Sequence, residues 1–251
     1  KIQKYFLLLI TLYISCLNSQ DNEIGVFFGG TNYIGEVGPT TYIDPLRGEY
    51  SRFKILQNNE GATINYTIGL LYRKNLSNRF AVRIQYSYAN IGSNDNWSGS
   101  AIYRKERGKK FENRINEINL GLDFNFLEFE TSSNDFQFTP YVNSGISYFR
   151  YDALHYPTGI NTAQSYGKAN NFAIPITIGI KIKPIDSFII GFETSARHSF
   201  TDNLDGSYPK FDDSNIYSQK PFSNALSKDW YVFSGIILTY LFGNYECDCI
   251  R

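Results

Sequence analysis

The sequence is poor in cysteine and histidine, and its formal charges cancel. It holds three Cys and two His in 251 residues, and Lys plus Arg equal Asp plus Glu at 24 each. So few cysteines exclude a fold built on several disulfides. The two histidines, His155 and His198, have no cluster of Cys or carboxylates beside them and make a poor metal site. The zero net charge provides no basic surface for nucleic acid.

Long apolar runs are also missing after the first residues. The mean hydropathy is −0.31, which is too polar for a bundle of membrane helices. No nucleophile elbow, Walker loop or H-E-x-x-H motif is present. The best candidate for a catalytic triad, His198 with Ser199 and Asp202, has a spacing no better than chance. We therefore expect no enzymatic activity, no cofactor and no bound metal.

The first residues have the pattern of a secretory signal peptide. A basic start, Lys1 to Lys4, precedes an apolar stretch over residues 5–17 and a short polar exit, with cleavage expected near Ser19 or Gln20. A short anchor helix and lipidation at Cys16 are the alternatives. The expected organisation is a signal peptide at 1–20, a single barrel domain at 21–243 and a periplasmic C-terminal tail at 244–251.

What the chain has in abundance is alternation of apolar and polar residues. Aromatic residues make up 17% of the composition and favour strands and membrane interfaces. Alternation with a period of two places each apolar series on one face of a strand. It is clear at residues 64–72, 80–88, 118–126, 172–182 and 188–193, and less regular at 24–30, 141–151 and 230–242. Together these segments predict eight strands.

The connections between these strands alternate between long and short. Long ones are expected at 32–61, 91–110, 152–170 and 200–229, and short ones at 74–78, 128–137 and 184–187. All long connections then emerge at one end, as in barrels of the bacterial outer membrane. The predicted fold is all-β: an eight-stranded antiparallel transmembrane β-barrel with long extracellular loops, short periplasmic turns and both termini in the periplasm.

A soluble barrel of the lipocalin kind would also alternate, but with its apolar face turned inward around a ligand. Three features favour the membrane barrel. The apolar series match the length of about ten residues that a tilted membrane strand needs. Many of them begin or end in Tyr or Phe, as interfacial girdles do. The opposite face is rich in Gly, Asn, Thr and Ser.

The expected inward faces carry charged residues, which are Arg83, Asp123, Lys181, Glu193 and Arg197. An eight-stranded barrel is only wide enough for its side chains to fill it. Isolated buried charges are costly, so these five should belong to a paired network that plugs the lumen. A catalytic or proton-relay site is the alternative. We predict no open pore.

The segment from Thr201 to Ser207 resembles a calcium loop at first sight. It includes Asp202, Asn203, Asp205 and Gly206. However, Leu204 stands between the acids and no Glu follows at the distance that an EF-hand requires. We expect a tight outer loop bonded to itself, with cation binding as the alternative.

Two cysteines remain near the C-terminus, Cys247 and Cys249. A direct bond between them would be strained, because one residue separates them. In an oxidising periplasm they are candidates for partner contact or for an intermolecular disulfide. A frayed tail with free or locally bonded thiols is the alternative.

Several short segments, taken in order, resemble PorG, the outer-membrane component of the type IX secretion system of Bacteroidota. The likeness runs from about residue 23 to 249 and is weakest near 44–60, 91–108 and 211–227. The segments are Phe28–Gly38, Phe111–Asn113 with Leu120–Phe126, Thr139–Tyr141 with Ser147–Asp152, Phe172–Pro175, Thr201–Gly206, Asp229–Gly235 and the Cys247–Cys249 pair.

This resemblance implies a role in protein transport that periodicity cannot reveal. Proteins of this kind are small barrels associated with a periplasmic ring of PorK- and PorN-type proteins, called GldK and GldN where gliding motility occurs. The implied function is non-enzymatic anchoring or positioning of that ring, through the short-turn side and the Cys247–Cys249 tail. The alternatives are an OmpX-like barrel acting through its extracellular loops in adhesion or defence, and an outer-membrane enzyme. We expect outer-membrane lipid around the barrel, and neither nucleic acid nor a small-molecule substrate.

Overall fold

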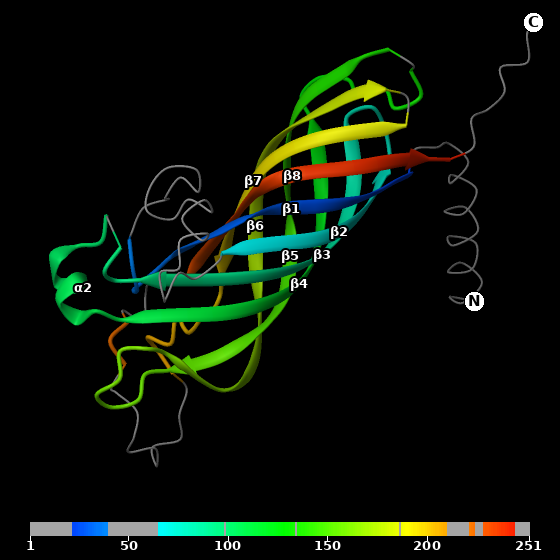
Figure 1. Cartoon of the computed structure of the whole chain (residues 1–251). Coiled ribbons are helices and arrows are strands. Elements are labelled where there is room, and N and C mark those ends of the chain that lie inside the picture. The colour runs from blue at the N-terminus through cyan, green and yellow to red at the C-terminus, as the bar shows by residue number, and fades with distance from the viewer. Residues whose placement is uncertain are drawn as a thin grey trace, which may run out of the picture.

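The chain forms a closed barrel of eight antiparallel strands in which each strand pairs with its sequence neighbours and β8 closes on β1 (Figure 1). The structure is a computed structural model. It describes residues 22–39, 65–97, 99–133, 135–185, 187–209, 221–223 and 228–243. The predicted signal peptide and the predicted C-terminal tail lie outside these residues. The predicted fold class is confirmed.

In the described residues the chain forms all eight predicted strands and one short helix that was not predicted. The strands are β1 (Asn22–Ile34), β2 (Tyr66–Asn75), β3 (Phe80–Asn94), β4 (Lys110–Asn125), β5 (Gln137–His155), β6 (Gln164–Ile185), β7 (Phe188–Ser199) and β8 (Trp230–Phe242). The helix is α2 (Ile102–Arg107), in the connection between β3 and β4. Among the described residues, no helix has both the length and the apolar character needed to cross a bilayer.

The long connection predicted over 152–170 is wrong. Strand β5 continues to His155 and β6 begins at Gln164, so only a short link remains between them. The prediction failed because the outward residues there, such as Asp152 and Lys168, are polar and interrupt the apolar alternation. The strand continues above the apolar belt, where its outer face meets water.

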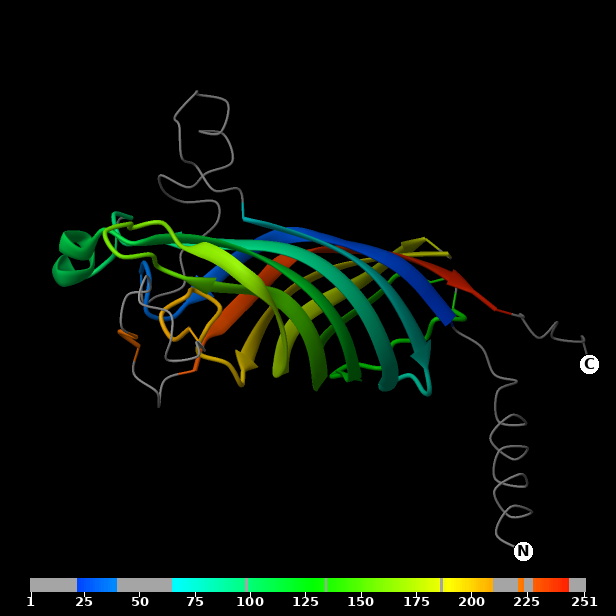
Figure 2. The ribbon, with the colours of Figure 1, turned by 90° about the horizontal axis from the view of Figure 1, so that it is seen from below.

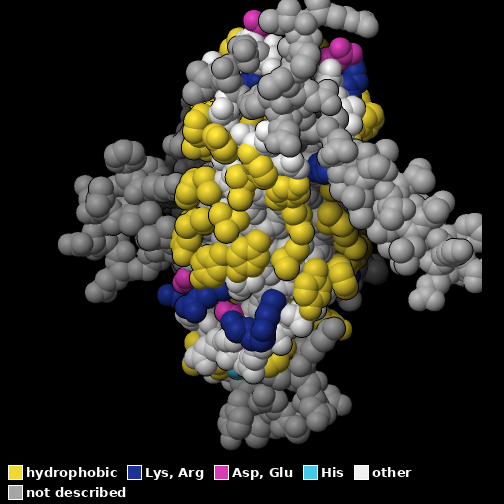
Figure 3. All heavy atoms as spheres, turned by 90° about the vertical axis from the view of Figure 1, so that its right-hand side faces the viewer, with side chains coloured by type: hydrophobic (Ala, Val, Ile, Leu, Met, Phe, Trp, Pro, Cys, Tyr) yellow, Lys and Arg dark blue, Asp and Glu magenta, His cyan; other side chains and the backbone are white. Residues whose placement is uncertain are grey.

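The outer surface of the barrel is apolar and its interior is polar. Leu70 on β2 and Ile178 on β6 are 62% and 63% exposed, and their neighbours along each strand point inward. Figure 3 shows apolar side chains spread over one face, bordered on one side by Lys and Arg. A soluble barrel would have the opposite arrangement, because a monomeric soluble protein rarely exposes so large an apolar patch. This surface is that of a membrane-spanning barrel.

The two ends of the barrel carry different connections. Short turns join β2 to β3, β4 to β5 and β6 to β7 at one end, where Asn22 of β1 also pairs with Phe242 of β8. Figure 2 shows α2 at the opposite end, together with the connection after β7. We call the end with α2 the cap end and the other the turn end.

The barrel wall is tight where glycines face one another across neighbouring strands. Gly121 of β4 pairs with Gly145 of β5, and Gly29 of β1 pairs with Gly235 of β8. A Cβ atom on Gly145 would lie 2.0 Å from the carbonyl oxygen of Leu120. Any larger residue there would have to push the two strands apart.

Candidate functional site

The lumen near the turn end is filled by an ion-pair network centred on Arg73 and Asp123. Arg73 pairs with Glu23, and its Nε lies 2.7 Å from Oδ2 of Asp123. Asp123 is shared, because Nε of Arg83 and Nζ of Lys181 lie 3.7 Å and 3.6 Å from its oxygens. All of these side chains are almost fully buried.

Neutral donors complete this network. Asn143 donates to Asp123 over 2.8 Å, and Asn75 donates to Glu23 over 2.9 Å. Glu193 accepts from Arg83 at 2.7 Å and from the hydroxyl of Tyr141 at 2.6 Å. Buried carboxylates are tolerated when they are both paired and hydrogen-bonded, as these are.

A second, separate pair lies nearer the cap end. Nε of Arg197 on β7 lies 2.8 Å from Oε1 of Glu117 on β4, across the lumen. The hydroxyl of Tyr231 also donates to Glu117 over 2.7 Å. The guanidinium of Arg197 lies 3.8 Å from the ring centroid of Phe233, within the range of a cation–π contact. Aromatic rings of Phe27, Phe149 and Phe233 fill the lumen around it.

The five charged residues selected from the sequence all lie inside the barrel, but they do not form one group. Arg83, Asp123, Lys181 and Glu193 share the first network, whereas Arg197 pairs with Glu117. Sequence reasoning missed Glu23, Arg73 and Glu117 because each stands just beyond the apolar series that defined its strand. The next inward-facing position beyond each predicted strand is the position of one of these residues. The ion pairs of the two groups join four acids, Glu23, Glu117, Asp123 and Glu193, to four bases, Arg73, Arg83, Lys181 and Arg197.

The triad considered in the sequence is not assembled. His198 and Ser199 are consecutive in β7 and therefore point to opposite sides of the wall. The ring of His198 lies against Trp230 with centroids 4.7 Å apart. Ser199 donates from Oγ to the main-chain oxygens of Asp229 and Thr201. This serine has no histidine base.

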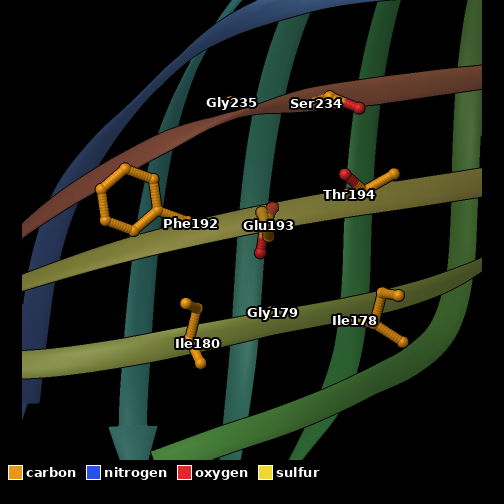
Figure 4. Close-up of a pocket in the computed structure, with 8 residues that line it drawn as sticks. All are labelled: Ile178, Gly179, Ile180, Phe192, Glu193, Thr194, Ser234 and Gly235. Atoms are coloured by element: carbon orange, nitrogen blue, oxygen red, sulfur yellow. The ribbon is translucent and has the colours of Figure 1, made fainter. Parts of the chain in front are cut away.

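A shallow groove of about 430 Å³ lies across β6, β7 and β8 (Figure 4). Ile178, Ile180 and Phe192 line it beside the smaller Thr194 and Ser234. Glu193 also borders it, but its carboxylate is bonded to Arg83 and Tyr141 inside the lumen. The groove is a dent in the lipid-facing surface and offers no free reactive group among the residues that line it.

The cap end is folded around a buried carboxylate, Asp95. Asp95 accepts hydrogen bonds from the main-chain N–H groups of Gly38 (2.8 Å) and Lys109 (2.9 Å) and pairs with Arg107 through both oxygens. Arg104 of α2 donates to the carbonyl oxygens of Gly35 and Gly38. These bonds fasten α2 to the segment that follows β1.

The loop after β7 packs into the same cap. Asp202, Asn203, Asp205 and Gly206 are all buried, and Gly206 has a φ of +82° that favours glycine. Asp205 accepts from the N–H of Ser207 over 2.8 Å, which is a local Asx turn. Asn113 of β4 also donates to the carbonyl oxygen of Leu204 over 2.7 Å. The loop is bonded both to itself and to the barrel.

Acidic groups of the cap have raised pKa values. Burial, with the nearby charges of Asp205 and Asp202, raises the pKa of Glu36 to about 7. Burial and the charge of Asp205 raise the pKa of Asp229 well above its ordinary value. Burial also raises the pKa of Asp202 and of Asp205.

The cysteines predicted to contact a partner, Cys247 and Cys249, lie outside the described residues.

The apolar exterior and the polar lumen with its buried ion pairs define a membrane β-barrel. The chain belongs to the DUF6089 family, described as a domain of unknown function, whose model matches residues 2–251. No curated protein matches the sequence significantly.

Solved structures of small outer-membrane barrels resemble this chain. OprG of Pseudomonas aeruginosa is 10% identical, with a TM-score of 0.46 over 90% of this chain and 98% of that one. Ail, the attachment invasion locus protein of Yersinia pestis, is 9% identical, with a TM-score of 0.43 over 89% of this chain and 99% of its own. The N-terminal β-barrel domain of Pseudomonas aeruginosa OprF is 11% identical, with a TM-score of 0.41 over 89% and 98%.

Proposed function

We propose that this chain is a PorG-like outer-membrane component of a type IX secretion system and that it anchors or positions the periplasmic PorK/PorN-type ring. The observation that carries this proposal is the filled lumen, with eight charged side chains paired inside the barrel. Such a barrel has no room for cargo, so its function must lie on its surfaces. The ordered sequence segments that resemble PorG support the specific assignment.

We assign the turn end to the periplasm. The start of β1 and the end of β8 lie there, so the predicted tail with Cys247 and Cys249 would emerge on the same side. Three large apolar residues are exposed near these turns: Leu76, Leu127 and Phe136. These three residues form our proposed ring-contact surface, because apolar side chains at a polar rim suit a protein partner.

The test is affinity purification of the tagged chain from membranes, followed by mass spectrometry. Ring proteins should be recovered with the wild type and lost with the variant Leu127→Asp, Phe136→Asp. The matched control is Ile102→Asp, Tyr103→Asp, which adds the same charges to exposed positions of α2 at the cap end. Absence of ring proteins from the wild-type sample would overturn the function and leave the fold unchanged.

The C-terminal cysteines make a separate part of the proposal. We propose a disulfide from Cys247 or Cys249 to a ring protein, which oxidising conditions of the periplasm allow. Non-reducing gels of membranes should show a larger species that disappears in the variant Cys247→Ser, Cys249→Ser. If the two samples migrate identically, no linked partner exists and the ring contact depends on noncovalent surfaces.

One observation favours a second function, in which an OmpX-like barrel acts through its cap in adhesion or defence. Ile102 and Tyr103 of α2 are 78% and 62% exposed on a rigidly bonded cap. The two functions differ in the phenotype of a deletion strain. Secretion of signal-bearing cargo would continue without the barrel under the second function and would stop under the first.

A further inference from the structure

Three carboxylates from distant parts of the chain converge at the cap end. Glu36 follows β1, Asp202 lies in the loop after β7, and Asp229 immediately precedes β8. One oxygen from each lies within 4.8 Å of the other two. Asp229 is fully buried and Asp202 is 6% exposed. We call these three residues the cap carboxylates.

A fourth acid, Asp205, lies beside them, and one of its carboxylate oxygens has no hydrogen-bond partner among the described residues. It is fully buried, and its charge raises the pKa of both Glu36 and Asp229. Within the described parts of the chain, its Oδ2 has no hydrogen-bond partner. The same is true of Oε2 of Glu36 and Oδ1 of Asp202. Buried carboxylate oxygens without partners are rare in folded proteins and require an explanation.

The arginine side chains near the cap carboxylates donate their hydrogen bonds to other groups. Arg104 donates to the carbonyl oxygens of Gly35 and Gly38, and Arg107 pairs with Asp95 while donating to the carbonyl oxygen of Glu36. Lys228 offsets part of the charge on Asp202. Several acids in one desolvated place need a counter-charge, because burial of an unpaired carboxylate is costly.

We propose that Glu36, Asp202 and Asp229 bind a divalent cation of the calcium type, with Asp205 adding negative charge beside it. Calcium prefers carboxylate and carbonyl oxygens, whereas a zinc site uses mainly nitrogen and sulfur ligands. The described cap carboxylates offer only oxygen. This proposal goes beyond the anchoring function. It replaces the expectation of no bound metal and extends the alternative of cation binding by the loop over 201–207 to ligands from two further segments.

Remaining hydrogen bonds hold the proposed ligands in place. The hydroxyl of Tyr33 donates to Oδ1 of Asp229, and the N–H of Leu204 donates to Oδ2 over 2.9 Å. Oγ of Ser223 donates to Oδ2 of Asp202 over 2.6 Å, which leaves Oδ1 for a cation. A bound cation would join the exit of β1, the loop after β7 and the entry of β8.

The test uses the full chain folded in detergent, with Ca²⁺ titrated in a calorimeter against an EDTA-treated sample. Saturable binding is expected, with a dissociation constant on the order of 10⁻⁴ M, as for calcium modules outside the cell. Mg²⁺ should bind more weakly, since it is reluctant to give up its waters. No saturable binding of Ca²⁺ by the wild-type protein overturns the proposal.

Terbium gives an independent readout in the same sample. Tb³⁺ bound to the cap carboxylates should luminesce when tyrosine is excited, because Tyr33 contacts Asp229. Ca²⁺ should displace the signal, and luminescence that Ca²⁺ does not displace would count against the site.

Matched variants locate the binding. Glu36→Gln and Asp202→Asn keep side-chain size and remove one charge each, so each should weaken Ca²⁺ binding at least about tenfold. Asp152→Asn is the control, because Asp152 is also an acid at the cap end but pairs with Lys168. Unchanged affinity in both cluster variants would place the cation elsewhere and overturn the assignment. Folding of each variant is checked by its shifted migration in unheated gels.

Discussion

A double-mutant cycle on Glu117 and Arg197 measures their interaction free energy, and this value shows whether the lumen around them excludes water. Both side chains are almost fully buried, and the pair stands apart from the larger network around Asp123. Removing one partner of a buried pair leaves the other charge uncompensated, which typically costs about 3–5 kcal/mol. Arg197→Met and Glu117→Leu should each destabilise the barrel by about that amount.

The double variant should cost much less than the two single variants together. With both charges gone, the main loss is one acceptor: the hydroxyl of Tyr231, which donates to Glu117 over 2.7 Å in the wild type, is left unsatisfied. An unsatisfied buried hydroxyl costs about 1–3 kcal/mol. The double variant should therefore be more stable than either single variant.

The assay is urea unfolding of the barrel folded in detergent, followed by tryptophan fluorescence. Trp230 at the start of β8 reports on the wall near Arg197, because these residues lie on paired strands. If each single variant costs less than about 1 kcal/mol, or if the costs simply add, the two charges are hydrated rather than paired. The reasoning about a filled lumen would then be refuted.

Four further outcomes follow from the structure. Gly145→Val should prevent folding, because its Cβ would lie 2.0 Å from the carbonyl oxygen of Leu120; a variant that still shifts in unheated gels would contradict this. Asp95→Asn should loosen the cap, since about 1.5–3 kcal/mol is at stake for each bond to a charged group, and limited proteolysis should cut the cap faster while the barrel survives. With EDTA present, the free energy of unfolding should fall as the pH rises from 4.5 to about 7, because folding raises the pKa of Glu36 and the folded state therefore holds that proton more tightly. If Glu36→Gln shows the same dependence of the unfolding free energy on pH as the wild type, this explanation is wrong. In planar bilayers the protein should give no conductance of porin size, and stable wide channels would show an open lumen.

The number of strands and their inward faces were predictable because the bilayer imposes a strict rule. An outward residue in the membrane must be apolar, so alternation is visible wherever a strand is in contact with lipid. The rule stops at the membrane surface. On β5 and β6 the outward residues Asp152 and Lys168 are charged and pair with each other, and the pattern there resembles a loop although the strands continue. This is why the connection over 152–170 was predicted too long.

The cap carboxylates could not be predicted for a different reason. Asp202 and Asp205 lie close in sequence and drew attention, but Glu36 and Asp229 stand far away along the chain. Only closure of the barrel, which places β8 beside β1, brings them together. A comparison with a continuous calcium loop was therefore bound to fail, since the ligands come from three segments. Within the lumen, Arg73 and Glu23 escaped notice because their strands were drawn too short.

The joint between the first and last strands also has a consequence for assembly. Glu23 of β1 accepts from Arg73 of β2 on one side and from Thr239 of β8 on the other, at 3.0 Å in the second case. A slip of β8 by two residues would keep its apolar face outward and still move Thr239 away from Glu23. The buried carboxylate of Glu23 thus stabilises one register of β1 against β8 over the registers two residues away, so barrel closure is selective for that alignment.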